Sequence, residues 1–261
     1  MIKKILLIIS IVYLLSCSYL YVFQENLIFP SYTVDFDKFE IQNTDIEELT
    51  IRTKDNKTLN GVIKNGINPN ILILYFGGNA DDPREFTTLY PELEEYDIVT
   101  FNYRGYGKSE GTPSEKTLFE DALKIYDEYS QNKDVIIIGR SLGSGVATYL
   151  ASQRDAKGLI LITPYDSIVS MAQNKYFFVP VKYLIKHKFE STKYIKELNL
   201  PIAIIEVAND TTVPNIHTQN LIKEIKNDME HTIFTNTTHG DVLNHPDIGL
   251  LMSDFIGRLN E

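Results

Sequence analysis

Short apolar runs recur along the chain after its N-terminal segment, with longer amphipathic stretches between them. Apolar runs without polar alternation are typical of strands that are buried on both faces of a sheet. Strands that alternate with helices indicate a mostly parallel sheet with helices on both faces, so we predict the α/β class. The predicted strands lie at residues 48–53, 59–64, 71–76, 98–103, 135–138, 159–163, 202–207 and 232–234, and the predicted helices lie at residues 114–129, 144–153, 216–225 and 248–259.

The body of the chain, residues 24–261, is predicted to form one domain because no linker-like composition interrupts it. Residues 168–189 fit neither a core strand nor a short connection. A long excursion after a strand is often a lid over a site, so we predict a lid there. From Val181 to Lys188 the lid shows a helical pattern, with apolar residues on one face and Lys182 and Lys186 on another. Such a stripe can rest on an anionic bilayer surface. The interpretation that we favour is a helix that packs on the core with its lysines in water.

The N-terminal segment has a different pattern from the body. Residues 5–23 carry no charge and are numerous enough to cross the hydrocarbon core as a helix. Lys3 and Lys4 precede this run, and the positive-inside rule keeps such an end in the cytoplasm. We therefore predict that residues 1–23 are a single-pass membrane anchor and that the body is exported to the periplasmic or extracellular side.

Two alternatives involve cleavage of this segment. The sequence Leu14-Leu15-Ser16-Cys17 resembles a bacterial lipoprotein signal, in which Cys17 would carry the lipid and become the mature N-terminus. A plain secretory signal peptide is the other alternative. The apolar run continues past Cys17, which favours the uncleaved helix.

Charge and cysteine content narrow the classes of partner. The chain of 261 residues has a formal net charge of −10 at pH 7, and an acidic protein repels phosphate backbones. We therefore expect no nucleic-acid partner. Cys17 is the single cysteine, so no disulfide can form within the chain, and no Cys/His cluster has zinc-site spacing. We expect neither a metal nor a cofactor.

The motif Gly139-Arg140-Ser141-Leu142-Gly143 has the G-x-S-x-G pattern of a nucleophile elbow. It follows one predicted strand and precedes a small-residue helical segment, which is the context that this motif requires. A serine in such a strained turn projects its hydroxyl out of the sheet, and glycines are needed where the chain segments approach closely. We predict that Ser141 is the nucleophile.

A serine nucleophile needs a general base and an acid that orients this base. In this fold class the order along the chain is serine, acid, histidine. His239 follows the last predicted strand by a short polar loop, and Asp210 follows the preceding strand, so we predict these two residues as base and acid. His245 is the alternative base, whereas His187, His217 and His231 are expected to be surface or packing histidines. Asp166 is the alternative acid, and Asp241 is disfavoured because it is adjacent to His239 in the sequence.

The oxyanion hole is expected to consist of two backbone N–H groups. One belongs to Leu142, the residue after the nucleophile, and the other comes from the loop after an early strand. That loop is Gly77-Gly78-Asn79-Ala80, and we predict Asn79 as the second donor.

These motifs together resemble the membrane-anchored α/β-hydrolases, which include depalmitoylating thioesterase-like and serine aminopeptidase-like enzymes. The resemblance implies the α/β-hydrolase fold, with Ser141, Asp210 and His239 as the catalytic triad. One departure is Gly77, where relatives usually have histidine, in the loop that carries Asn79. The matching segments are residues 77–80, 102–115 and 139–145, Asp210 with Val213-Pro214, His239-Gly240, and residues 24–31 after the anchor.

We therefore predict a serine hydrolase that cleaves carboxylic ester or thioester bonds through an acyl-enzyme on Ser141. The aromatic and aliphatic residues in the lid favour a small-molecule or lipid-like acyl substrate that is presented near a membrane. Two alternatives remain. One is a serine peptidase that acts on short peptides, and the other is a catalytically inactive binding module on the same fold.

Overall fold

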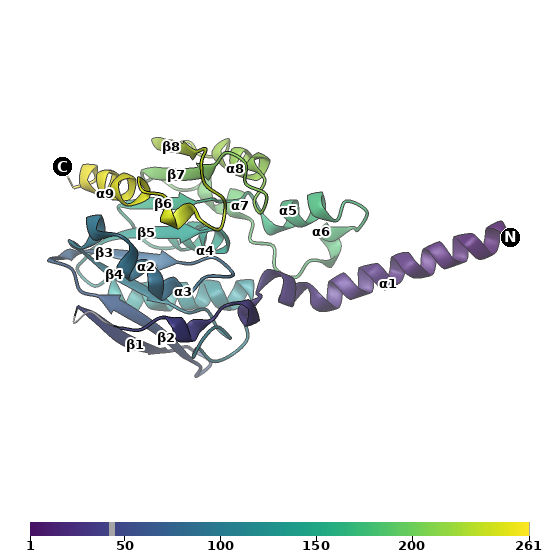
Figure 1. Ribbon diagram of the computed structural model, residues 1–261, viewed down its shortest axis with the longest axis horizontal. Helices are drawn as coiled ribbons and strands as arrows, with labels where there is room; N and C mark the ends of the chain where they lie inside the picture. The colour runs from purple at the N-terminus through teal and green to yellow at the C-terminus, as the bar shows by residue number, and fades with distance from the viewer. Residues whose placement is uncertain (42–44, 261) are drawn as a thin grey trace.

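One mixed sheet lies at the centre of the body (Figure 1). The computed structural model describes residues 1–41 and 45–260, and within these ranges eight strands pair in the order β1-β2-β4-β3-β5-β6-β7-β8. Strand β2 is antiparallel to β1 and β4, and the other neighbouring pairs are parallel. The predicted α/β class is confirmed. The strands are β1 Ile46–Arg52, β2 Thr58–Lys64, β3 Asn68–Phe76, β4 Tyr96–Phe101, β5 Asp134–Arg140, β6 Gly158–Ile162, β7 Ile202–Val207 and β8 Met229–Phe234.

The apolar runs in the middle of the sheet mark strands that are covered on both faces, whereas the edge strands β1 and β8 are partly exposed. In β3, Leu72 and Leu74 belong to one hydrophobic core, whereas Ile73 and Tyr75 belong to a second core on the opposite face. Successive side chains of a strand point to opposite faces, so a strand without polar alternation needs a layer of helices on each side. A side chain such as Leu72, which is fully buried, contributes roughly 1.5–3 kcal/mol through this burial.

Helices supply both layers. Helices α3 and α4 contribute Leu118 and Val146 to the first core, and α2 and α9 contribute Phe86 and Met252 to the second. The helices in the body are α2 Phe86–Leu89, α3 Glu115–Tyr129, α4 Leu142–Ala151, α5 Ile168–Lys175, α6 Val181–Leu184, α7 Ser191–Ile195, α8 Asn215–Ile222 and α9 Ile248–Arg258. Short 3₁₀ turns lie at Ser31–Thr33, Phe36–Lys38, Pro83–Glu85, Pro91–Leu93 and Val242–Asn244.

Local backbone and side-chain features explain where α3 and α4 begin. Ser114 accepts a hydrogen bond from the Thr117 N–H (3.1 Å), and the Ser114 N–H donates to the Thr117 hydroxyl (2.9 Å), which forms a capping box on α3. Helix α4 begins at Leu142, two positions before the predicted start at residue 144, because the glycine turn itself forms the first helical turn.

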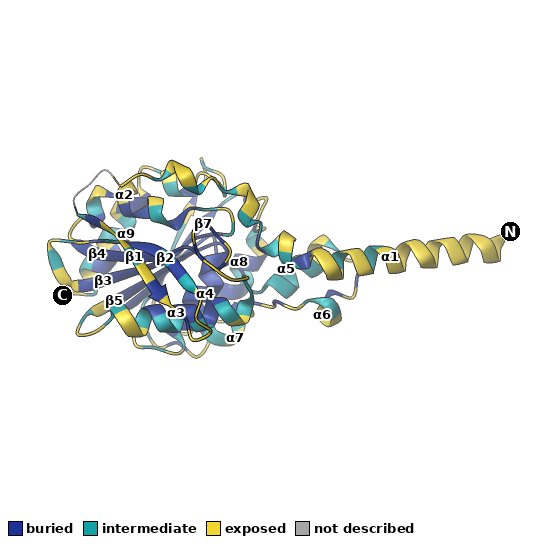
Figure 2. Ribbon diagram, turned by 90° about the horizontal axis from the view of Figure 1, so that it is seen from below, coloured by how far each residue is buried: buried dark blue, intermediate teal, exposed yellow. Residues whose placement is uncertain are grey.

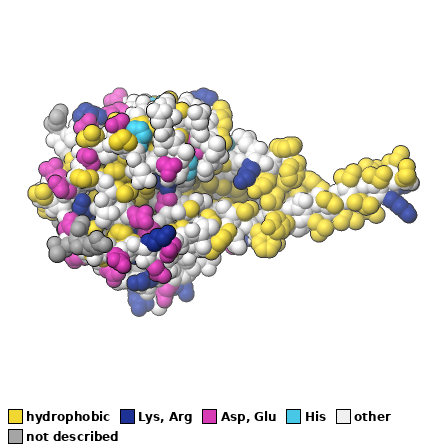
Figure 3. Space-filling model, viewed as in Figure 1, with side chains coloured by type: hydrophobic (Ala, Val, Ile, Leu, Met, Phe, Trp, Pro, Cys, Tyr) yellow, Lys and Arg dark blue, Asp and Glu magenta, His cyan; other side chains and the backbone are white. Residues whose placement is uncertain are grey.

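The N-terminal helix α1, Ile2–Ile28, extends away from the body, and most of its surface is exposed (Figure 2). Its most apolar window has a mean hydropathy of 2.3, so it is long and apolar enough to cross a membrane. Hydrophobic side chains gather along α1 and where it meets the body (Figure 3). The helix does not end at residue 23 but continues to Ile28, because its last turns pack on the body and bury Gln24.

The segment predicted as a lid contains α5 and α6 and lies beside the base of α1 (Figure 1). The prediction of a continuous helical stripe from Val181 to Lys188 is wrong, since α6 ends at Leu184. The Lys186 N–H donates to the side chain of Gln24 (2.7 Å) instead of to a helical carbonyl. A tertiary contact with α1 therefore accompanies the end of this helix.

Candidate active site

Ser141 occupies the tight turn between β5 and α4. Its backbone has φ 48° and ψ −118°, a conformation that costs energy for a residue with a side chain. A Cβ atom at Gly139 or Gly143 would collide with the backbone of Gly143 or Phe76, respectively. Both glycines of the motif are therefore required by close backbone approach, as the sequence predicted.

A chain of hydrogen bonds joins Ser141, His239 and Asp210. His239 Nε2 lies 3.0 Å from Ser141 Oγ, and His239 Nδ1 lies 2.6 Å from Asp210 Oδ2. The other oxygen of Asp210 accepts the backbone N–H groups of Thr212 and Val213, each at 2.8 Å. These bonds hold the carboxylate in one orientation, and Ser141 and Asp210 are both buried. The structure thus brings together the three residues that the sequence placed after three different strands.

The rival acid, Asp166, lies at the end of β6 and contacts a different histidine. Its Oδ1 lies 2.9 Å from His217 Nδ1, and it also accepts the Ser167 N–H (2.6 Å). Burial raises the pKa of Asp166, but hydrogen bonds from His217, the Ser167 N–H and Asn220 outweigh this effect and hold the pKa below its ordinary value.

The sequence did not reveal the pairing of Asp166 with His217. We predicted His217 as a surface or packing histidine, and its exposure of 1% agrees with a packing role, but it also lines the cleft at Ser141. The signal available in the sequence was the position of Asp166, which follows β6 as Asp210 follows β7. No local pattern identified its partner in α8.

The two predicted oxyanion donors, Leu142 and Asn79, line the same cleft as Ser141. Leu142 is the first residue of α4, where a backbone N–H has no intrahelical acceptor. The neighbouring Gly78 N–H is occupied, because it donates to Asp81 Oδ2 (2.6 Å). Tyr103 stabilises this loop, because its hydroxyl donates a hydrogen bond to the Gly77 carbonyl (2.8 Å).

Arg140, the variable residue before Ser141, joins the two loops that flank the serine. Its guanidinium forms an ion pair with Asp81 and donates to the backbone carbonyl of His239 (2.6 Å). Burial opposes the charge of Arg140, but the Asp81 carboxylate raises the pKa of the guanidinium above its ordinary value. Sequence reasoning missed this role, although the arginine directly before Ser141 in the motif was the signal that could have found it.

Ser141 opens into a cleft of about 680 Å³. Its walls include apolar residues from α1 and the lid, such as Ile28, Ile168 and Met171, and the polar pair of His217 and Asn174. Within residues 1–41 and 45–260, no group of three or more His, Cys, Asp or Glu side chains could hold a metal ion.

Comparison with known proteins shows which proteins this chain resembles. The family profile described as "alpha/beta hydrolase fold" matches residues 71–189. The chain is 28% identical over 224 residues to an uncharacterized protein of Mycobacterium tuberculosis, covering 81% of this chain and 78% of that protein. It is 35% identical over 170 residues to the lysophosphatidylserine lipase ABHD12 of Danio rerio, covering 55% of this chain and 44% of that lipase.

Solved structures show the same fold at low sequence identity. An esterase of Pyrococcus furiosus superposes with a TM-score of 0.62 at 19% identity, over 82% of this chain and 92% of that one. An acetyl xylan esterase of Paenibacillus sp. R4 gives a TM-score of 0.62 at 12% identity, over 83% and 86% of the two chains. The matched profile and the shared architecture of these structures show that this chain has the α/β-hydrolase fold.

Proposed function

We propose that this α/β-hydrolase cleaves carboxylic esters through an acyl-enzyme on Ser141. The observation that carries the proposal is the chain of hydrogen bonds from Ser141 through His239 to Asp210, beside a cleft with apolar walls. Thioesters present the same carbonyl carbon to a nucleophile and are included in the proposal. The lipase and esterase relatives support ester cleavage.

In this mechanism His239 acts first as a base and then as an acid. Its Nε2 accepts the proton of Ser141 Oγ while the oxygen attacks the carbonyl carbon, and the negative charge that develops on the carbonyl oxygen is stabilised by the N–H groups of Leu142 and Asn79. The protonated imidazole then gives its proton to the leaving alcohol or thiol. Water repeats the sequence on the acyl-enzyme and releases a carboxylic acid and free Ser141.

We further propose that α1 anchors the enzyme with its N-terminus in the cytoplasm and its body exported. The charge-free run after Lys3 and Lys4 supports this orientation. A reporter enzyme that is active only outside the cytoplasm, fused after the last residue, should be active. Mass spectrometry of the intact protein tests the anchor, because a diacylglycerol on Cys17 with residues 1–16 missing would replace the spanning helix by a lipid.

Covalent labelling tests the nucleophile. A fluorophosphonate probe should label the wild-type protein on Ser141, and Ser141→Ala should abolish both labelling and turnover. The matched control is Ser152→Ala, which changes a serine at the end of α4 outside the cleft. Absence of labelling in the wild-type protein would favour an inactive module. Faster cleavage of aminoacyl amides than of esters or thioesters would favour a peptidase.

A further inference from the structure

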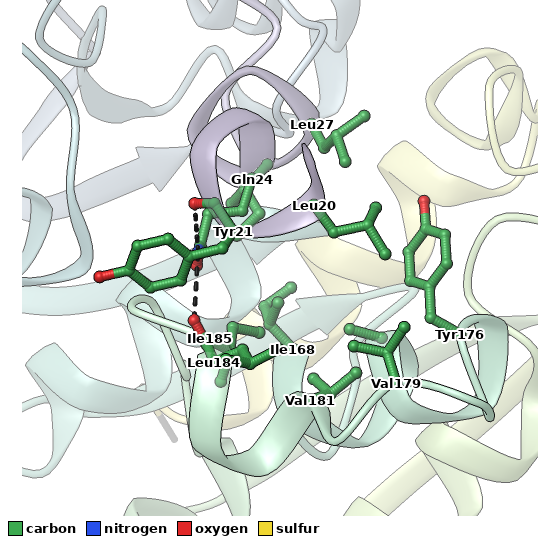
Figure 4. A pocket seen from close by; sticks show the side chains of 12 residues that line it. Leu20, Tyr21, Gln24, Leu27, Ile168, Tyr176, Val179, Val181, Leu184 and Ile185 are labelled. Carbon is green, nitrogen blue, oxygen red and sulfur yellow. Dashed lines mark hydrogen bonds between the residues drawn. The ribbon is translucent and has the colours of Figure 1, made fainter. Parts of the chain in front are cut away.

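A separate apolar groove lies between the base of α1 and the lid (Figure 4). It has a volume of about 90 Å³. Leu20 and Leu27 of α1 form one wall, and Ile168, Tyr176 and Val179 of the lid form the other. The membrane helix therefore contributes side chains to a cavity instead of serving only as a tether.

The amide of Gln24 is already satisfied within this groove. Its Nε2 donates to the carbonyl of Leu184 (3.1 Å), and its Oε1 accepts the Lys186 N–H (2.7 Å). Lys186 also forms an ion pair with Glu25 (3.1 Å). These contacts join α1 to the lid and leave the amide of Gln24 bound to protein groups, so the groove is suited to an apolar ligand.

The groove adjoins the cleft that contains Ser141, because the two spaces share lining residues. Ile28 of α1 and Ala172 of the lid line both spaces, together with Leu27, Ile168 and Tyr176. On the opposite side, Tyr176 and Leu20 also line a shallow apolar depression along the middle of α1. Adjoining spaces that share apolar lining residues therefore lie between the cleft at Ser141 and the exposed part of the helix.

The position of Leu20 on the helix relates the groove to the bilayer. At about 1.5 Å per residue, residues 5–23 span about 28 Å, which is close to the thickness of the hydrocarbon core. Leu20 then lies near the outer boundary of this core. Phe177 and Tyr183 of the lid are 81% and 83% exposed, and aromatic side chains favour the interface at this depth.

We propose that this groove binds the long acyl chain of a membrane-resident ester and directs its carbonyl group to Ser141. The anchor helix is then one wall of the substrate site, and the chain passes from the bilayer into the groove without crossing water. This inference rests on the proposed function of Ser141 as the nucleophile. A soluble short-chain ester reaches Ser141 through the open cleft and does not need the groove.

Filling the groove separates the two kinds of substrate. In full-length protein reconstituted in phospholipid nanodiscs, Leu20→Trp should lower kcat/KM for p-nitrophenyl dodecanoate by about tenfold or more, since each methylene removed from an apolar site changes affinity about fourfold. Hydrolysis of p-nitrophenyl butyrate should change by less than about twofold, because a short-chain ester does not need the groove. The matched control is Leu14→Trp, on the exposed part of α1, which should affect neither ester.

The proposal is overturned if Leu20→Trp slows both esters equally, slows neither, or acts no differently from Leu14→Trp. Failure of the proposed function looks different, because the wild-type protein would then hydrolyse neither ester and would not react with a fluorophosphonate.

A second measurement needs no variant. A dodecyl fluorophosphonate with a diazirine at the chain end should crosslink, after reaction with Ser141, to residues 17–28 or to the lid around Val179. Crosslinks confined to the loop from Thr211 to Pro214, on the other side of the cleft, would show that the chain runs away from α1 and would overturn the proposal.

Discussion

Two aspartate–histidine pairs lie at the carboxyl ends of neighbouring strands. Asp210 follows β7 and contacts His239 at 2.6 Å, and Asp166 follows β6 and contacts His217 at 2.9 Å. In both pairs the aspartate contacts Nδ1 of the histidine and also accepts backbone N–H groups. The two pairs differ in what lies beyond the histidine. His239 Nε2 faces the hydroxyl of Ser141, whereas His217 Nε2 faces the amide of Asn174 (3.2 Å).

Because of this difference, we expect only the first pair to be catalytic, although the aspartates of both pairs are buried. A neutral imidazole with its proton on Nδ1 donates to the aspartate and accepts at Nε2. At His239 the group that donates to Nε2 is a strained serine, which can become a nucleophile. At His217 the group that donates to Nε2 is the amide of Asn174 in α5, and an amide cannot become a nucleophile in this way. The second pair instead connects α8 to the lid helix α5.

The largest test of this comparison replaces each histidine. We expect His239→Ala to lower kcat on a short-chain ester by about 10⁴-fold or more, because the members of a triad act as a unit. His217→Ala should lower kcat on the same ester by less than about tenfold, since His217 contacts α5 and does not contact Ser141. Equal losses in the two variants would contradict the distinction between the pairs.

The aspartates provide the next test. Asp210→Asn should lower kcat by about 10³–10⁴-fold while the protein remains folded, because an amide favours the wrong tautomer of His239. Asp166→Asn changes an equally buried carboxylate and is the matched control, with an expected effect below about tenfold. A greater loss of activity in Asp166→Asn would assign the acid to the other pair. Circular dichroism of both variants checks that they are folded.

The two histidines are also held differently. His217 lies within α8, whereas His239 lies in a loop, where Arg140 donates to its backbone carbonyl and forms an ion pair with Asp81. We expect Arg140→Gln to lower kcat by about 10–100-fold with little change in KM, because small displacements of catalytic groups are costly.

The matched control for this change is Arg154→Gln, which removes a partly exposed arginine from its ion pair with Asp127. It should leave kcat unchanged, since such pairs contribute about 0–1 kcal/mol to stability. An unchanged rate of fluorophosphonate labelling in Arg140→Gln would show that Arg140 does not position the site.

The smallest expected effect concerns stability in acid. The pKa of Asp166 is lowered in the folded protein, so this carboxylate stabilises the fold above its unfolded pKa of about 3.9, and that stabilisation is lost as the pH falls through the folded-state pKa. Asp166→Asn should therefore lower Tm at pH 6–7. Each kcal/mol of free energy of unfolding that is lost should lower Tm by about 2–4 °C. The difference from wild type should shrink below pH about 4. A difference that is constant across this range would show that charge is not the cause.

The sequence by itself determined the strands and the order of the site residues. A run of apolar residues without polar alternation indicates a strand that is buried on both faces. Such a run can be recognised from consecutive residues alone. The same holds for the glycines around Ser141, whose spacing reflects a close approach within one strand–turn–helix unit, and for the cap at Ser114. Asp210 and His239 were predicted from their positions after strands, because the carboxyl ends of parallel strands meet at one edge of a sheet.

Only the tertiary structure decided which partners these residues have. Asp166 and Asp210 occupy equivalent positions in the sequence pattern, and the arrangement of α8 and the last loop assigns His217 to one and His239 to the other. The contact of Gln24 with Leu184 joins residues 160 positions apart, so no local periodicity could indicate where α6 ends or that α1 lines a groove. Hydrophobic periodicity reports whether a side chain is buried, but the identity of its neighbour is determined by how the elements pack together.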